Sequence, residues 1–363
     1  MHIVQREVLK RVWGEGMTDV AVVGAAGYVG IEAVRLVLGH PRLQLVCATS
    51  AADAGKALAM VYPALTGQTE LAFCDVDVDR IADEANVVLL AVPHTAALSL
   101  VPDLLARGIT VIDLSADYRL SDAATYEQWY GATHTSPELL AEAVFGLPEL
   151  DRSRLPGAGL VACPGCYPTA TTLAALPALE SGVAVGSRVV VDAKSGVSGA
   201  GRSASAATHF VTVNESVAAY KVGGTHRHTP EIEQALSAAA RRDVSVVFTP
   251  HLVPMTRGLL STVYLDVEDG FTTAAAVELY QGRYEDEPFV HVHEAQTMPS
   301  TAEVTGSNRA AIGVAVDERT NTLVAVCAID NLGKGAAGQA IQCLNAVLGY
   351  PETEGFERPG PVV

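Results

Sequence analysis

Residues 19–39 read DVAVVGAAGYVGIEAVRLVLG, and this stretch decides the fold. Asp19 is followed by Val-Ala-Val-Val, a short apolar run rich in β-branched side chains, which predicts a buried strand. The segment YVGIEAVRLVLG then has apolar residues at helical spacing and ends at Gly39, with Pro41 beyond it. A glycine followed by a proline commonly closes a helix. The stretch therefore predicts a strand, a glycine-rich turn and a helix in that order.

The turn carries Gly24, Gly27 and Gly30. Glycines at this point permit a tight turn and a close approach of the backbone, which places a pyrophosphate on the N-terminus of the following helix. Ordinary turn glycines are the alternative interpretation, but the strand before them and the helix after them favour a dinucleotide site. We expect the residues of this turn to contact the cofactor: Gly24, Ala26, Gly27, Tyr28, Val29 and Gly30.

Further strands follow at 43–49, 85–93 and 109–115, and a helical stretch at 95–108 separates the last two. Strands that are apolar on both faces and alternate with helices predict a parallel sheet covered on both sides. After about residue 163 the chain has several strands with few long helices between them, which predicts a mixed or antiparallel sheet. The fold class is therefore α/β, a Rossmann-type domain joined to an α+β catalytic and dimerisation domain.

The length of 363 residues fits two domains, because single cores stop growing at roughly 250 to 300 residues. We expect an N-terminal extension at 1–18, a dinucleotide-binding domain at 19–163 and 333–363, and a catalytic domain at 164–332. The amphipathic segment 334–350 is expected to return to the first domain.

The net charge of −17 disfavours nucleic acid and anionic membrane surfaces as partners. The six cysteines are spread thinly through the chain, and several lie in apolar runs, as reduced buried thiols do. No apolar run is long enough to span a membrane, and the N-terminus lacks the pattern of a signal peptide. The sequence thus predicts a cytoplasmic protein.

At the end of the second predicted strand, Thr49 and Ser50 stand where an NAD-selecting carboxylate is usual. Their hydroxyl groups can bond a 2′-phosphate, so NADP is the expected cofactor. Asp53 lies close enough to keep NAD as the alternative.

Cys163 and Cys166 lie three residues apart where a loop leads into a helix. A metal site would need a second cysteine pair or nearby histidines, so no metal is expected. Cys166 lies at the mouth of the helix, where the dipole favours a thiolate nucleophile. Cys163 is either a bystander or a thiol that forms a disulfide with an oxidised Cys166, and a dithiol oxidoreductase remains an alternative.

His226 and His228 precede another predicted helix and would project to one face of an extended segment. Acid/base catalysis, metal ligation and plain surface exposure are the alternatives, and a nucleophile that needs a proton donor favours the first. Arg119, Arg202 and Arg257 lie in polar turns and are candidates for binding phosphate or carboxylate.

Eight motifs in order resemble the N-acetyl-gamma-glutamyl-phosphate reductase family, whose wider relatives include aspartate-semialdehyde and glyceraldehyde-3-phosphate dehydrogenases. The motifs are GAAGYVG, DLSADYRL, FGLPEL, PGCYPT, SGVSGAGR, HRHTPEI, FTPHLVPMTRG and DNLGKGAAGQAIQ. The resemblance implies that Cys166 is the nucleophile and His226, or else His228, the acid/base. It also implies cofactor contacts at Ser195, Gly196 and Asn331, and a substrate-binding role for Glu231 beside the three arginines.

The implied reaction is the NADPH-dependent reduction of an acyl phosphate, N-acetyl-L-glutamyl 5-phosphate, through a cysteine thioester, in a homodimer or homotetramer. Three alternatives stay open: a reductase for aminoadipyl or aspartyl phosphate, a non-catalytic NADP(H)-responsive binding protein, and the dithiol oxidoreductase. Cys163 departs from the family, which commonly carries Asn or an apolar residue there.

Overall fold

The computed structural model describes residues 16–357 and 360, and it divides them into two compact units. Unit 1 holds the chain up to Pro164 together with a segment that begins at Ala336, and unit 2 holds Gly165–Gly335. Most of the N-terminal extension expected at 1–18 lies outside the described residues, and the first strand begins at Thr18.

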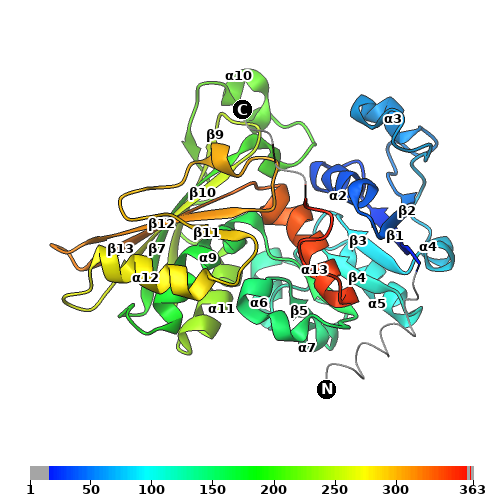
Figure 1. The fold of residues 1–363 in the computed structure, drawn as a ribbon. Helices are drawn as coiled ribbons and strands as arrows, with labels where there is room; N and C mark the ends of the chain where they lie inside the picture. The colour runs from blue at the N-terminus through cyan, green and yellow to red at the C-terminus, as the bar shows by residue number, and fades with distance from the viewer. Residues whose placement is uncertain (1–15, 358–359, 361–363) are drawn as a thin grey trace. The chain divides into compact units, whose positions relative to one another are not determined.

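Unit 1 is built on a parallel sheet with the strand order β2-β1-β3-β4-β6-β5 (Figure 1). All the strand pairs described in this sheet are parallel, as the runs of residues apolar on both faces predict. The bounds are β1 Thr18–Val23, β2 Leu43–Ala48, β3 Val87–Leu90, β4 Thr110–Asp113, β5 Val144–Phe145 and β6 Leu160–Ala162. The Rossmann-type first domain is therefore confirmed.

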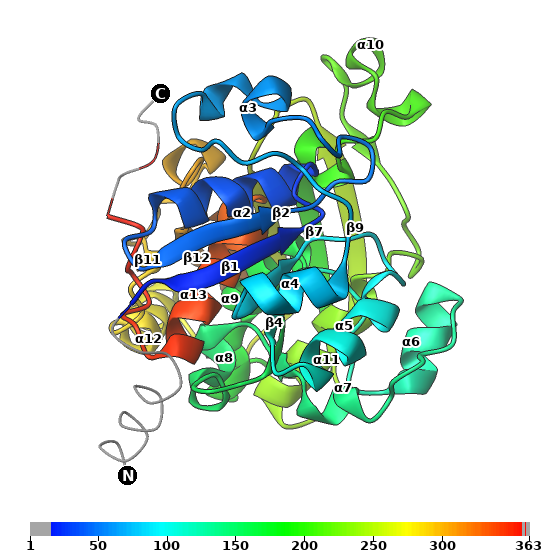
Figure 2. The same cartoon turned by 90° about the vertical axis from the view of Figure 1, so that its right-hand side faces the viewer.

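Helices cover both faces of this sheet (Figure 2). On one face, α2 (Tyr28–Gly39) and α13 (Gly338–Leu348) pack on Val20, Val22 and Leu89. On the other face, α4 (Val78–Glu84) and α5 (Ala97–Ala106) pack on Ala21, Val23 and Val88. The helix α13 thus belongs to the first unit. The other helices of unit 1 are short: α3 Leu58–Val61, α6 Ala123–Tyr130, α7 Leu139–Glu142 and α8 Pro148–Asp151.

Unit 2 contains a mixed sheet with the strand order β11-β12-β13-β10-β7-β9-β8. The pairs β7 with β9 and β11 with β12 are parallel, and the other pairs are antiparallel. The mixed sheet expected for the second domain is confirmed. The bounds are β7 Arg188–Gly196, β8 Ala218–Ala219, β9 Ser245–Val253, β10 Leu259–Asp266, β11 Val290–Val292, β12 Ala310–Asp317 and β13 Thr322–Ile329.

Three helices, α9 (Cys166–Glu180), α11 (Thr229–Ala240) and α12 (Thr273–Tyr284), pack on one face of this sheet. The strands alternate in burial, and the side chains that point away from the helices include the exposed Val190, Val247 and Tyr264. A sheet face in the monomer that keeps large apolar side chains exposed is typical of an interaction surface. Unit 2 also contains α10 (Phe210–Val213), which is one turn long.

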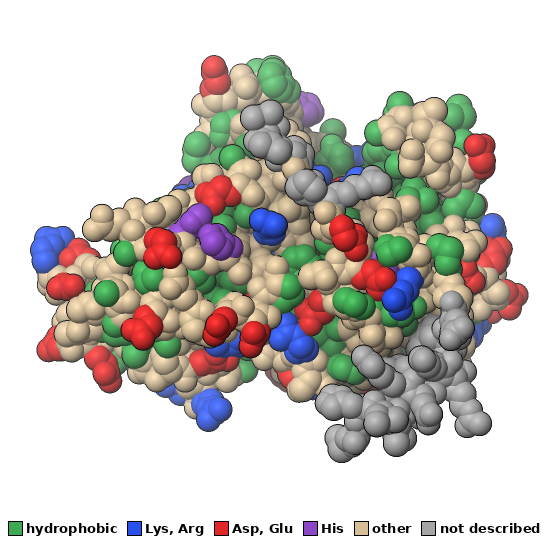
Figure 3. All heavy atoms as spheres, viewed as in Figure 1, with side chains coloured by type: hydrophobic (Ala, Val, Ile, Leu, Met, Phe, Trp, Pro, Cys, Tyr) green, Lys and Arg blue, Asp and Glu red, His purple; other side chains and the backbone are tan. Residues whose placement is uncertain are grey.

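The surface reflects the acidic composition. Figure 3 shows Asp and Glu side chains spread over the visible face and interspersed with Lys and Arg, rather than gathered in one patch. Many of them form ion pairs on the surface, such as Arg283 with Glu180. No helix in the described part of the chain has the length and apolar character that a membrane crossing requires.

Candidate active site

Cys166 is the first residue of α9, the central helix of unit 2. Its N-cap is Gly165, which has no side chain to accept the free N–H groups of the first turn. Pro168 falls in this turn, where its missing N–H costs no intrahelical hydrogen bond. Every residue from Tyr167 to Leu179 is buried, whereas Cys166 is only partly buried. The sequence therefore places a reachable thiol at the positive end of a rigid helix, where a thiolate is favoured.

Glu231 binds the backbone of Gly165, the N-cap residue of α9. Its Oε1 accepts a hydrogen bond of 2.8 Å from the backbone N–H of Gly165, and the side chain is buried. Glu231 itself lies in the first turn of α11, so this carboxylate joins the starts of two helices. A carboxylate is favourable there because both helix N-termini carry partial positive charge. The predicted substrate-binding residue thus holds the nucleophile's helix in place.

The segment after Asp330 forms one wall of the site. Gly333–Ala337 is a π-helical turn that runs directly into α13. A side-chain Cβ at Gly335 would lie 2.7 Å from the Cβ of Cys166 and 3.2 Å from the carbonyl oxygen of Asp330. The absence of a side chain at Gly335 therefore allows the nucleophile to sit against this turn. Turns of π-helix are uncommon in proteins, and many of those that occur lie at functional sites.

His226 is buried beside Tyr167, Tyr220 and His228. Its ring centroid lies 5.5 Å from that of Tyr220, 5.7 Å from that of Tyr167 and 4.8 Å from that of His228. The Nδ1 atom accepts a hydrogen bond of 3.1 Å from the backbone N–H of His228. A backbone N–H can only donate, so the proton of the neutral ring is on Nε2.

The charge state of His226 follows from its surroundings. Burial, reinforced by Lys221 and Arg227, lowers the pKa of His226 to about 4. The imidazole is therefore neutral at physiological pH, with a defined Nε2–H donor. It can stabilise a developing oxyanion by a hydrogen bond without first being protonated.

Two tyrosines that were not predicted from the sequence, Tyr167 and Tyr220, complete this cluster. The Tyr220 hydroxyl donates to Tyr167 at 3.2 Å, and the Tyr167 hydroxyl donates to the carbonyl of His251 at 3.1 Å. Burial, with a smaller contribution from Cys166, raises the pKa of Tyr220 to about 12. Tyr167 follows Cys166 directly in sequence, but nothing in the sequence indicates that Tyr220 packs against it.

The cofactor turn predicted in unit 1 has the backbone that a dinucleotide requires. Gly24 has φ 83°, and a Cβ there would collide with the carbonyl of Ala91. A Cβ at Gly30 would collide with the carbonyl of Gly24, so both glycines are sterically required. Gly27 is the N-cap of α2, and the space beside it is open except for one contact at 3.6 Å. An open N-cap at a helix N-terminus fits a pyrophosphate.

The other predicted residues of the turn surround this N-cap. Ala26 is buried, and its carbonyl accepts a 2.6 Å hydrogen bond from Tyr62. Tyr28 and Val29 begin α2, and Tyr28 is exposed. Both are thus positioned at the helix start, as expected.

At the end of β2, Thr49 is buried and its Oγ1 accepts a 3.1 Å hydrogen bond from the N–H of Gly24. Thr49 therefore also stabilises the glycine turn. Ser50 is partly exposed. The carboxylate of Asp53 forms a 2.9 Å ion pair with Lys56.

The predicted arginines have different environments. Arg119 is in unit 1, is largely buried and donates to the carbonyl of Leu114 at 2.9 Å. Arg202 is an exposed residue of unit 2. Arg257 forms a bidentate ion pair with the fully buried Asp330, at 2.8 and 3.1 Å. Arg257 thereby anchors the segment that leads to the π-helical turn.

Three further residues of unit 2 were expected to contact the cofactor. Ser195 and Gly196 end β7, and the Ser195 hydroxyl donates to the carbonyl of Gly196 at 3.2 Å. Asn331 is buried; its Oδ1 accepts from the N–H of Gly258 at 2.8 Å, and its Nδ2 donates to Ser198 at 2.9 Å. Asn331 therefore ties the loop after β7 to the start of β10.

Cys163 belongs to unit 1, is buried and shares a hydrogen bond with Cys343, which helps to raise its pKa well above the ordinary value. All six cysteines are free thiols. The disulfide with Cys166 stays a prediction, and the contact with Cys343 favours a packing role for Cys163.

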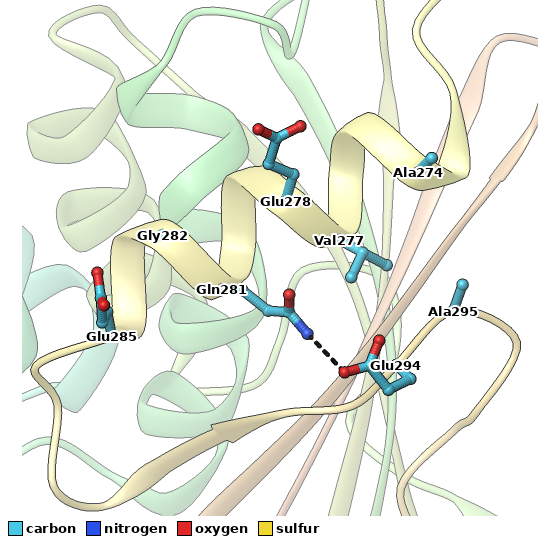
Figure 4. Close-up of a pocket in the computed structure, with 8 residues that line it drawn as sticks. All are labelled: Ala274, Val277, Glu278, Gln281, Gly282, Glu285, Glu294 and Ala295. Carbon is cyan, nitrogen blue, oxygen red and sulfur yellow. Dashed lines mark hydrogen bonds between the residues drawn. The ribbon is translucent and has the colours of Figure 1, made fainter.

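A surface pocket lies on α12 of unit 2. Three glutamates, Glu278, Glu285 and Glu294, contribute to its lining, and Gln281 donates to Glu294 at 3.4 Å (Figure 4). None of the predicted site residues lines this pocket. Within residues 16–357 and 360, no group of three or more His, Cys, Asp or Glu side chains is placed to hold a metal ion.

Known proteins resemble this chain over nearly its whole length. Residues 19–158 match the semialdehyde dehydrogenase NAD binding domain, and residues 166–331 match the semialdehyde dehydrogenase dimerisation domain. The N-acetyl-gamma-glutamyl-phosphate reductase of Symbiobacterium thermophilum is 50% identical over 94% of this chain and 98% of its own. Those of Geotalea daltonii and Geobacter sulfurreducens are each 49% identical, over 95% and 94% of this chain and 99% and 98% of their own.

Solved structures agree on the fold. Aspartate semialdehyde dehydrogenase II from Vibrio cholerae superposes with a TM-score of 0.70 at 16% identity, over 91% of this chain and 98% of that one. Aspartate semialdehyde dehydrogenase with NADP from Candida albicans gives 0.67 at 14% identity, with the same two coverages. Because 50% of the residues are identical over 94% of the chain and 98% of the relative, the chain belongs to the N-acetyl-gamma-glutamyl-phosphate reductase family.

Proposed function

We propose that this protein reduces N-acetyl-L-glutamyl 5-phosphate to N-acetyl-L-glutamate 5-semialdehyde and phosphate, a step of arginine biosynthesis, in the cytoplasm. The observation that carries this assignment is the 50% identity to a reductase of that name over 94% of the chain. The free thiol at the start of α9 supports it, because acyl transfer to sulfur needs an accessible thiolate.

The dinucleotide would be held in unit 1. The open N-cap at Gly27 and the sterically required Gly24 and Gly30 fit a pyrophosphate, and Thr49 fixes the turn that presents them. When bound, the nicotinamide cofactor supplies a hydride.

The reaction begins at Cys166. Its sulfur attacks the acyl carbon, the carbon–oxygen bond to phosphate breaks, and phosphate leaves with the electron pair to give a thioester. The Nε2–H of His226 donates a hydrogen bond to the carbonyl oxygen as negative charge develops there, which its fixed tautomer and low pKa support. At the aldehyde level, collapse of the thiohemiacetal returns the electron pair to sulfur and regenerates the Cys166 thiolate. His228 fixes the His226 ring through its backbone N–H.

NADPH is the proposed form of the cofactor. Thr49 and Ser50 follow β2 in place of a carboxylate, and the charge of the neighbouring Asp53 is paired with Lys56. A paired carboxylate repels a 2′-phosphate less than a free one does. The kcat/KM should be higher with NADPH than with NADH, and equal values would contradict this part of the proposal.

A homo-oligomer is also proposed. The match to a dimerisation domain and the exposed Val190, Val247 and Tyr264 support association through the sheet face opposite α9, α11 and α12. Light scattering coupled to size-exclusion chromatography should give a dimer or a tetramer. Tyr264→Glu should shift the mass toward the monomer, whereas an unchanged mass would place the interface elsewhere.

The decisive experiment follows the reaction in reverse. Phosphate-dependent reduction of NADP by N-acetylglutamate semialdehyde is expected for the parent protein and should be lost in Cys166→Ser, which should still bind NADPH. Cys74→Ser is the matched control, because Cys74 is also a partly exposed thiol but lies in unit 1. Activity with aspartyl or aminoadipyl substrates alone would support the related reductases, and thiol-independent turnover would exclude the proposed chemistry.

A further inference from the structure

A second pair of thiols meets at the edge of the sheet of unit 1. The Sγ atoms of Cys47, in β2, and Cys74 lie 3.3 Å apart. Two backbone hydrogen bonds fix their relative position: the N–H of Cys74 donates to Ala48 at 3.1 Å, and its carbonyl accepts from Ser50 at 2.9 Å. The contact is therefore set by strand pairing.

The register of this pairing places both side chains on one face. Cys74 forms a parallel bridge with Thr49, and Thr49 lies two residues after Cys47. Side chains two residues apart on a strand point the same way, so the Cys74 side chain faces that of Cys47. A disulfide bond is about 2.05 Å long. The sulfurs need to approach by only about 1.3 Å, a shift within the range of side-chain rotation.

The two thiols differ in access. Cys47 is 2% exposed, whereas Cys74 is partly exposed. Burial and the contact with Cys74 raise the pKa of Cys47 to about 12. The positive charge of Arg80 interacts with both thiols. An oxidant from solvent therefore reaches Cys74 first, and the second thiol is already in contact with it.

We propose that Cys47 and Cys74 form an oxidisable pair that hydrogen peroxide converts to an intramolecular disulfide. The sulfur of Cys74 attacks one peroxide oxygen, the O–O bond breaks, and water leaves, so that Cys74 becomes a sulfenic acid. The sulfur of Cys47 then attacks that of Cys74, the S–O bond breaks, and the oxygen leaves as a second water with the Cys47 proton. Two thiols and one peroxide give one disulfide and two waters.

The cross-link closes the loop of residues 47–74, which contains Thr49 and Ser50. Loop closure restricts the unfolded chain, so the oxidised protein should melt at a temperature several degrees higher. The proposal does not depend on the catalytic role of Cys166, because the thiol pair lies in the other unit.

The test uses the full chain treated with one equivalent of hydrogen peroxide. Remaining thiols are then blocked with N-ethylmaleimide under denaturing conditions, and the protein is digested without reduction. A cross-linked peptide pair containing Cys47 and Cys74 is expected, with recovery of both thiols after dithiothreitol. Free Cys47 and Cys74 at a peroxide dose that oxidises other cysteines would overturn the proposal.

Three variants sharpen the result. In Cys47→Ser, the sulfenic acid on Cys74 should persist and be trapped by dimedone; without such trapping, Cys74 is not the first site of attack. Cys47 is buried, so its substitution can impair folding. Cys74→Ser is the milder substitution, and it should abolish both the cross-link and the rise in melting temperature. Cys343→Ser removes the other thiol contact of unit 1 and should leave the Cys47–Cys74 cross-link intact. A melting shift that survives Cys74→Ser would refute the assignment.

Discussion

Gly335→Ala is the sharpest probe of how the nucleophile is positioned. The added Cβ would lie 2.7 Å from the Cβ of Cys166 and 3.2 Å from its Cα. Carbon atoms in contact are normally about 3.5 to 4.0 Å apart. The conflict therefore amounts to about 1 Å, and both neighbours are held by backbone rather than by a flexible side chain. Gly335 does not have a positive φ, so the effect is steric and not conformational.

We expect this substitution to lower the free energy of unfolding by about 1 to 3 kcal/mol, as overpacking of a core does. A displacement of about 1 Å at a reacting atom costs on the order of 100-fold in rate. The kcat/KM should fall by about that factor, and the rate of Cys166 alkylation by iodoacetamide should change with it. Gly282→Ala in α12 is the matched control, because a Cβ there meets nothing within 4 Å.

A double-mutant cycle separates the contact from general damage. In a Cys166→Gly background the clashing Cβ is absent, so Gly335→Ala should cost clearly less stability than it does in the parent. Urea unfolding of the four proteins measures this coupling without any need for activity. Equal costs in both backgrounds, or a Gly335→Ala enzyme with parental kcat/KM, would refute the steric argument.

Three further predictions concern the residues around Cys166. The pKa of His226 is lowered from 6.5 to about 4, so the unfolded chain binds the proton more tightly than the folded chain does. The free energy of unfolding should therefore fall by roughly 3 kcal/mol as the pH drops from 6.5 to about 4. In His226→Asn, urea unfolding should lose most of this pH dependence, and an unchanged pH dependence would contradict the assigned pKa. Glu231→Ala should destabilise the protein by about 1 to 3 kcal/mol, because it leaves the N–H of Gly165 without its acceptor. Glu231→Gln keeps an acceptor oxygen and should cost less in the same denaturation assay, whereas equal losses would argue against this hydrogen bond. Tyr220→Phe removes the hydroxyl that donates to Tyr167. Urea unfolding should show a free energy of unfolding lower by about 0.5 to 1.5 kcal/mol. An unchanged free energy would mean that this hydrogen bond is not formed in solution.

The sequence predicted the elements that depend on local patterns. The strand, glycine turn and helix of residues 19–39 are found as β1 and α2, because periodicity and glycine spacing are properties of neighbouring residues. The position of Cys166 at a helix start follows from the same kind of signal. The amphipathic pattern of α13 needs an apolar partner, and the helix packs on the core of unit 1.

Contacts between distant segments could not be read in this way. Nothing near Glu231 indicates that its carboxylate accepts from Gly165, and nothing near Cys47 indicates the single bridge that brings Cys74 to it. Both depend on the register of packed elements, which one sequence does not specify. Gly335 carried a weak signal, because a glycine within an amphipathic helical pattern often has a packing reason. The expected helix from 334 begins instead as the π-helical turn that accommodates Cys166.

The charges around the candidate nucleophile are consistent with an anionic substrate. The carboxylate of Glu231 already occupies one N–H at the start of α9, so a Cys166 thiolate must share the positive end of this helix with another negative charge. A neutral His226 adds no cation. Lys221 and Arg227 are close enough to lower the pKa of His226, so their positive charge reaches the site. Burial does most to keep the imidazole neutral, and the two cations add to its effect. The same two cations favour the approach of an acyl phosphate, so their charge serves both the hydrogen-bond donor and the substrate.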